Sequence, residues 1–78
     1  MTSIKVLGTG CANCKATQKL IETVLAANGI QAAVEKVEDL PAIMKYGVIS
    51  TPGVVINGTV VHVGGVPTRA QIERWLTA

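Results

Sequence analysis

The segment GTGCANCK at residues 8–15 contains the two cysteines of the chain, Cys11 and Cys14, with two residues between them. A short apolar run at residues 4–8 leads into the pair and is typical of a strand. Residues 15–28 carry apolar side chains every three or four positions, as an amphipathic helix does. We therefore predict that the cysteines lie where a strand gives way to a helix, with Cys11 at or just before the first helical residue.

The start of a helix changes the chemistry of a cysteine placed there. Unpaired backbone amides and the helix dipole favour negative charge at this end, which lowers the pKa of a thiol such as Cys11 from about 8.5 towards neutrality. One helical turn brings Cys14 beneath Cys11, so a mixed disulfide formed at the first sulfur can be released by the second. Gly8 and Gly10 should leave the approach to Cys11 open.

Further elements continue an alternation of strands and helices. Gly29 can end the first helix with a left-handed cap, and residues 30–37 form a strand pattern of weak apolar character. Residues 40–46 have helical spacing, with Pro41 in the first turn, where a missing amide hydrogen does no harm. The two successive strand–helix–strand steps imply parallel neighbouring strands with right-handed crossovers.

A hairpin and a helix complete the chain. Residues 54–56 and 59–63 have strand character and flank Asn57-Gly58, the dipeptide best suited to a two-residue turn of positive φ. Thr68 and Gln71 match a capping box, and the apolar face of a final helix follows them. The predicted order is βαβαββα, which is an α/β fold.

The composition predicts one compact domain, residues 1–78, with an aliphatic core. Of the 78 residues, 49% are apolar and 15% are charged, which separates the chain from disordered sequences. Tyr46 and Trp75 are the aromatic residues, and there is no phenylalanine. In so thin a core we expect both aromatic side chains to serve packing.

Charge and hydropathy exclude several classes of partner. The net charge of +2 comes from seven basic and five acidic residues without a run of either sign, which argues against nucleic acid. No apolar stretch approaches the roughly 20 residues needed to span a bilayer and no leader pattern opens the chain, so we expect no membrane association. One closely spaced cysteine pair indicates a cytoplasmic protein rather than a secreted domain held by disulfides.

Several motifs carry a resemblance to a known family that covers almost the whole chain. GTGCANCK at residues 8–15 resembles the small thioredoxin-like proteins called redox-active disulfide protein 2. Further segments are similar to the second half of thioredoxin, in the same order and at nearly the same spacing: Lys45-Tyr46-Gly47-Val48, Thr51-Pro52, Asn57-Gly58, Gly64 and the helix at 72–76.

The resemblance implies a thioredoxin-like fold of glutaredoxin size, with a four-stranded mixed sheet flanked by three helices. It implies that Cys11 is the nucleophile, Cys14 the resolving thiol and Pro52 a cis-proline that faces them. Gly10, Thr51 and Pro52 would bind the substrate. The implied activity is that of a thiol–disulfide oxidoreductase without a bound metal or organic cofactor, and the implied partners are protein disulfides and a reductase or dithiol donor.

The chain departs from thioredoxin at positions that tune such a site. Gly10 stands before the first cysteine in place of tryptophan, and Ala12-Asn13 stand between the thiols in place of Gly-Pro. Thioredoxin also has a buried acid on its first strand, and Lys5 stands at that offset here. One hypothesis places Lys5 under the sulfurs, paired with Glu35 of the neighbouring strand, where its charge would stabilise a thiolate through space.

Two other classes of function use the same motif. A carrier of copper(I) or zinc holds its metal through the two thiolates of a CxxC loop, but such carriers usually have methionine where this chain has Thr9 and follow the order βαββαβ. A structural zinc site would be short of ligands, because His62 is the one histidine and its strand position predicts a solvated side chain. A redox-sensing regulatory module shares the sulfur chemistry and differs in its partner.

Overall fold

A computed structural model describes residues 2–77, so the two end residues of the predicted domain, Met1 and Ala78, lie outside the described part. The elements follow the predicted order βαβαββα. They are β1 (Thr2–Leu7), α1 (Ala12–Asn28), β2 (Ala32–Val37), α2 (Leu40–Lys45), β3 (Gly53–Ile56), β4 (Thr59–Val63) and α3 (Arg69–Thr77).

The four strands form one mixed sheet, as the resemblance implied, and their order is β2-β1-β3-β4. β1 pairs with β2 in parallel and with β3 in antiparallel orientation, and β3 and β4 form the antiparallel hairpin. The prediction of parallel neighbours is therefore confirmed for the first strand–helix–strand step and wrong for the second.

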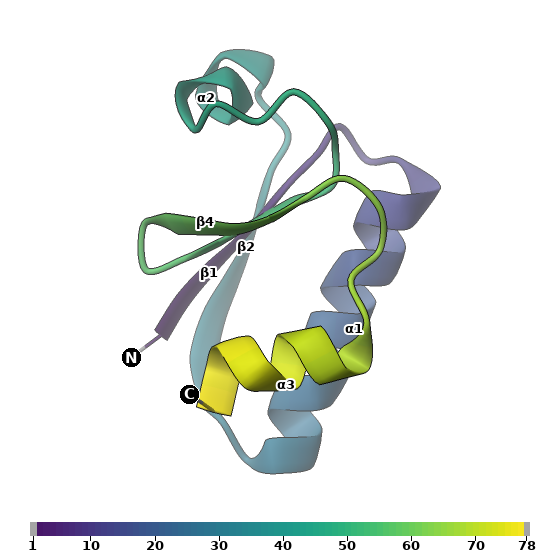
Figure 1. The fold of residues 1–78 in the computed structure, drawn as a ribbon, viewed down its shortest axis with the longest axis vertical. Coiled ribbons are helices and arrows are strands. Elements are labelled where there is room, and N and C mark those ends of the chain that lie inside the picture. Colours follow the sequence, from purple (N-terminus) through teal and green to yellow (C-terminus); the bar gives the residue numbers. More distant parts are fainter. Residues whose placement is uncertain (1, 78) are drawn as a thin grey trace.

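The length of α2 explains this reversal. Its six residues span about 9 Å, roughly half the length of a six-residue strand such as β2. α2 stays at the end of the sheet where β2 stops, and β3 starts back from that same end (Figure 1). A parallel return would need a connection that runs the full length of the sheet.

Two apolar clusters lie on opposite faces of the sheet. On the face covered by α1 and α3 (Figure 1), the buried residues are Ile4, Val6, Ile21, Val24, Leu25, Val54 and Ile72. On the α2 face they are Leu7, Ile43, Val48 and Val55. Trp75 packs against the first cluster and Tyr46 against the second, so the prediction that both aromatic residues serve packing is confirmed.

The local signals have the expected geometry. Gly29 caps α1 with a φ of 62°, and Asn57 and Gly58 turn the hairpin with φ values of 50° and 84°. The capping box is closed in both directions: the Thr68 amide donates to the Gln71 side chain at 2.9 Å, and the Gln71 amide donates to the Thr68 hydroxyl at 3.1 Å. These signals hold because each depends on residues within a few positions of one another.

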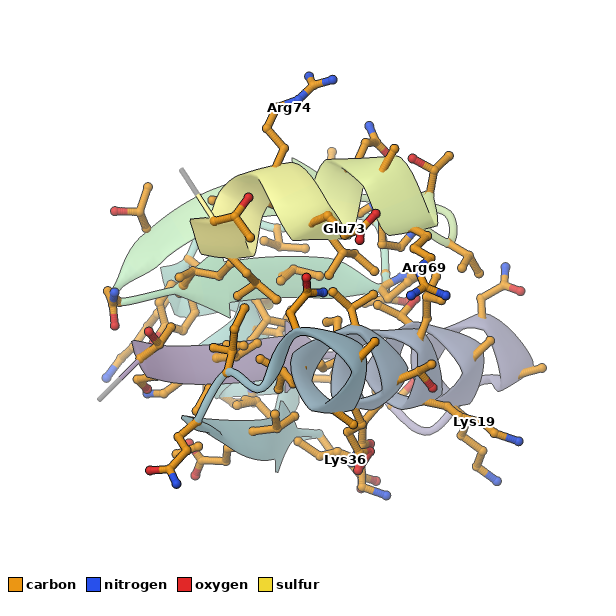
Figure 2. All side chains as sticks on the ribbon, turned by 90° about the horizontal axis from the view of Figure 1, so that it is seen from below. Lys19, Lys36, Arg69, Glu73 and Arg74 are labelled. Atoms are coloured by element: carbon orange, nitrogen blue, oxygen red, sulfur yellow. A yellow bond between two sulfur atoms is a disulfide. The ribbon has the colours of Figure 1, made fainter. Side chains whose placement is uncertain are left out.

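Charged side chains are spread over the surface. Lys36 and Arg74 point away from the body of the protein (Figure 2). Within residues 2–77 the salt bridges are two exposed pairs, Lys36–Glu38 at 3.9 Å and Arg69–Glu73 at 4.0 Å, which contribute little to stability. No helix of this described range is both long and apolar enough to cross a bilayer.

Candidate active site at the start of helix α1

Cys11 is the N-cap of α1, as its place in the motif predicts. Its backbone is extended, with φ −67° and ψ 163°, and its Sγ accepts a hydrogen bond of 3.1 Å from the amide of Cys14. The carbonyl of Cys11 accepts the amide of Lys15 at 3.0 Å. The first turn of α1 contains no acidic residue, so the helix itself places no negative charge beside a Cys11 thiolate.

Cys11 and Cys14 form a disulfide across this first turn, with their Cα atoms 5.1 Å apart. The two side chains differ in exposure, because Cys11 is exposed whereas 5% of Cys14 is accessible. A large molecule can therefore reach the first sulfur and not the second. This difference suits attack at Cys11 and release by Cys14.

Gly8 provides the space in which the sulfur of Cys14 lies. It is buried just beyond the end of β1, and a Cβ at this position would overlap Cys14 Sγ. The amide of Gly8 donates to the carbonyl of Val37 at 2.9 Å, which holds the glycine against β2. The expectation that Gly8 opens the approach to Cys11 is therefore corrected, since the glycine makes room for the buried sulfur instead.

Thr51 lies beside this glycine, and Pro52 follows Thr51 in the chain. The peptide bond between them is cis. Pro52 is buried, and the exposed Thr51 has its Cβ 3.7 Å from the position that a Cβ on Gly8 would take. The carbonyl of Pro52 accepts the amide of Gly64 at 2.8 Å, so the loop after β4 also borders the site.

The other residues predicted around the cysteines line the surface of the site. Gly10 has a φ of 82°, a left-handed conformation that favours glycine, and a Cβ there would lie 3.7 Å from a carboxylate oxygen of Glu38. Ala12 and Asn13 are exposed in the first turn of α1. The carbonyl of Asn13 accepts a hydrogen bond of 2.8 Å from the buried hydroxyl of Thr17, which braces this turn.

Lys5 does not form the predicted pair with Glu35. The two residues are in register between β1 and β2, yet no salt bridge joins them among the described residues. Lys5 donates instead to the hydroxyl of Tyr46 at 3.3 Å, with its Nζ 6.0 Å from the centre of that ring. Glu35 is exposed, and an exposed ion pair contributes little, whereas the half-buried phenol gives the ammonium a shielded partner.

The sequence assigned no role in the site to two of its contributors. Gly64 carries part of the family resemblance, but its bond to Pro52 joins segments that come together only through the fold. Thr17 lies fully buried in α1, where it interrupts an otherwise apolar face. A polar residue on such a face is the one signal that could have drawn attention to Thr17.

Comparison with known proteins identifies the family. Residues 2–77 match the family model described as thioredoxin domain. The chain belongs to the thioredoxin-domain family. Curated thioredoxins that it resembles include one from Methanothermobacter thermautotrophicus, 31% identical over 77 residues, and one from Methanocaldococcus jannaschii, 33% identical over 76 residues. The alignments cover 99% of this chain and 100% of the first relative, and 97% of this chain and 87% of the second.

Solved thioredoxin structures have the same fold. Chloroplastic thioredoxin z superposes with a TM-score of 0.73 at 20% identity, over 99% of this chain and 76% of that one. A mutant thioredoxin from Halobacterium salinarum gives a TM-score of 0.70 at 23% identity, over 96% of this chain and 71% of that one. At such identities the likeness establishes the thioredoxin fold alone.

The thioredoxin homologues and the Cys11–Cys14 disulfide together support thiol–disulfide oxidoreductase function. They do not favour the metal carrier or the regulatory module. In residues 2–77 no three histidine, cysteine, aspartate or glutamate side chains come together as metal ligands. Membership in the thioredoxin family implies, in general terms, protein substrates and a reductase that recycles the disulfide.

Proposed function

We propose that this thioredoxin-domain protein exchanges two electrons with protein disulfides, with Cys11 as the nucleophile and Cys14 as the resolving thiol. One observation carries the assignment. The exposed Cys11 caps α1, and its disulfide partner one turn further on is buried. An incoming sulfur therefore meets Cys11 first.

The reaction proceeds by two sulfur exchanges. The Cys11 thiolate attacks one sulfur of a substrate disulfide, forms a mixed disulfide and displaces the other substrate sulfur as a thiolate. Cys14 then loses its proton and attacks Cys11 Sγ, so the second substrate sulfur leaves as a thiolate. The substrate thiolates take up two protons, and the protein is left with the Cys11–Cys14 disulfide. A reductase or dithiol donor then returns two electrons by the same exchange in reverse.

The start of α1 activates the attacking sulfur. The amide of Cys14 donates to Cys11 Sγ at 3.1 Å, and the helix dipole adds to the positive potential there. Both effects favour the thiolate and lower the pKa of Cys11 in the reduced protein. Ala12 and Asn13, which lie between the two thiols, and Lys5 are the residues to which we assign tuning of the reduction potential.

We assign substrate binding to Gly10, which precedes Cys11, and to Thr51 and Pro52, since Thr51 lies near the glycine that accommodates the Cys14 sulfur. Two exposed apolar residues lie close to these positions in the sequence: Ile49, two residues before Thr51, is 96% exposed, and Val66, two residues after Gly64, is 41% exposed. Exposed apolar residues around a reactive group are typical of contact surfaces for another protein. A polypeptide held across Thr51 and Pro52 would present its disulfide to Cys11.

We also propose that residues 1–78 act as one domain in the cytoplasm. The chain has one cysteine pair and no other cysteines. A reducing compartment keeps such a pair available for repeated exchange, whereas secreted domains of this size use several disulfides as structural links.

A trapping experiment tests the assignment. Cys14→Ser leaves Cys11 free to attack but removes the thiol that releases the mixed disulfide. In cell lysate this variant should hold client proteins and a reductase through bonds that dithiothreitol breaks, and Cys11→Ser/Cys14→Ser is the matched control. The proposal fails if both variants trap the same proteins and the reduced wild-type protein does not reduce insulin disulfides.

A further inference from the structure

A β-bulge in β4 changes the direction of His62. Val60 pairs with Val55 and His62 with Val54, which leaves Val61 as an extra residue in β4. Val61 packs against the cluster on the α1 and α3 face, and strict alternation would turn His62 to the opposite face. The bulge brings both side chains to the α3 side, as bulges near active sites often do.

His62 thereby meets two partners. Its ring lies 5.7 Å from that of Trp75 in α3, at an interplanar angle of 45°. Its Nε2 lies 2.9 Å from the carbonyl oxygen of Gly65. A carbonyl oxygen only accepts, so Nε2 carries the proton and donates. The expectation of a solvated histidine is therefore corrected: the residue is half-buried beside Trp75, although its hydrogen bond to Gly65 is exposed.

Gly65, which accepts the hydrogen bond from His62, belongs to a segment of two consecutive glycines. Gly64 and Gly65 both have a left-handed backbone, with φ values of 75° and 69°. Consecutive glycines have wide conformational freedom, so such a segment keeps one shape only where external bonds hold it. The Gly64 amide donates to the carbonyl of Pro52 at 2.8 Å, and the His62 side chain holds the next residue.

We infer that His62 is a positioning residue for partner binding, because it fixes the 64–65 segment, which is hydrogen-bonded to Pro52 and leads into the exposed Val66. The inference rests on the proposed function and adds a residue that touches neither sulfur. Loss of the His62 donor should let Gly65 sample other conformations and displace Val66, while the chemistry of Cys11 and Cys14 stays unchanged. Partner binding should weaken, and sulfur exchange with a small disulfide should not.

Two variants at this position separate hydrogen bonding from packing. His62→Leu keeps an apolar contact with Trp75 and removes the donor, and His62→Gln places an amide N–H near the position of Nε2. Thr77→Val is the matched control, because it removes a comparable exposed hydrogen bond, at 2.6 Å to the carbonyl of Glu73, at the end of α3. The readouts are KM and kcat with insulin, the reaction rate with 5,5′-dithiobis(2-nitrobenzoic acid), and the NMR order parameters of the Gly64 and Gly65 amides.

For His62→Leu we expect KM for insulin to rise by about three- to tenfold, the range that loss of one hydrogen bond allows. The rate with the small disulfide should stay at the wild-type value, and the order parameters of the two glycines should fall. His62→Gln and Thr77→Val should match the wild-type protein. Unchanged glycine order in His62→Leu, or an equal loss in His62→Gln, overturns the inference. Failure of the wild-type protein to reduce insulin would instead count against the proposed function, and the order parameters would still decide the role of His62.

Discussion

The sulfur of Cys14 occupies the space that a side chain on Gly8 would fill. This contact lets the first turn of α1 lie directly against the end of β1. It also keeps Cys14 buried while Cys11 stays exposed. The asymmetry of the proposed site thus depends on a glycine outside the CxxC motif.

Gly8→Ala should destabilise the reduced protein by about 1–3 kcal/mol, the usual cost of overpacking. Backbone strain does not contribute, because Gly8 is not among the glycines with positive φ. Urea denaturation of Gly8→Ala, Cys14→Ala and the double variant measures the coupling between the two positions. The loss of stability caused by Gly8→Ala should largely disappear in the protein that also carries Cys14→Ala, because the sulfur is then absent. An equal loss with and without Cys14→Ala would contradict the contact.

Limiting iodoacetamide should label Cys11 of the reduced, folded protein in strong preference to Cys14. Cys11 is exposed at the helix N-cap, whereas 5% of Cys14 is accessible. Fragmentation mass spectrometry of the peptide that holds both cysteines measures the ratio. In urea the preference should vanish, and equal labelling in the folded state would remove the basis for assigning Cys11 as the nucleophile.

Lys5 and Tyr46 allow charge and hydrogen bonding to be tested separately. Lys5→Met removes a positive charge from β1 at nearly constant size, so the pKa of the Cys11 thiol should rise. Tyr46→Phe removes the 3.3 Å hydrogen bond and keeps the charge, so it should cost about 0.5–1.5 kcal/mol of stability and leave that pKa unchanged. Thiolate absorbance near 240 nm as a function of pH measures the Cys11 titration. An unchanged titration in Lys5→Met would show that this lysine has no tuning role.

Ile49→Ser should impair reduction of insulin and leave stability within about 0.5 kcal/mol of the wild-type value, since the side chain is 96% exposed. Leu40→Ser is the matched control, because Leu40 is also apolar and 58% exposed but lies at the start of α2. The comparison uses KM for insulin and urea denaturation of each variant. Equal KM values for the two variants would argue against a binding surface at Ile49.

Much of the fold follows from short-range patterns. The helix start at Cys11, the left-handed cap at Gly29, the turn at Asn57-Gly58 and the capping box at Thr68 all agree with the structure. Each involves a hydrogen bond or backbone conformation confined to about one turn of chain. The strand–helix–strand pattern predicted the wrong orientation for β3, because that orientation depends on how far α2 carries the chain relative to the length of the sheet.

The features of the candidate site also fall into local ones and ones that depend on the tertiary structure. The sequence by itself determined that two thiols lie one helical turn apart at a helix N-terminus, because that arrangement needs only local geometry. Tertiary structure alone decided that Gly8 makes room for Cys14, that Lys5 binds Tyr46 rather than Glu35, and that a bulge turns His62 towards Gly65. These contacts depend on strand register, on a one-residue insertion in a strand and on competition between alternative partners. All three involve residues that only folding brings together, so no short stretch of sequence contains a pattern that predicts them.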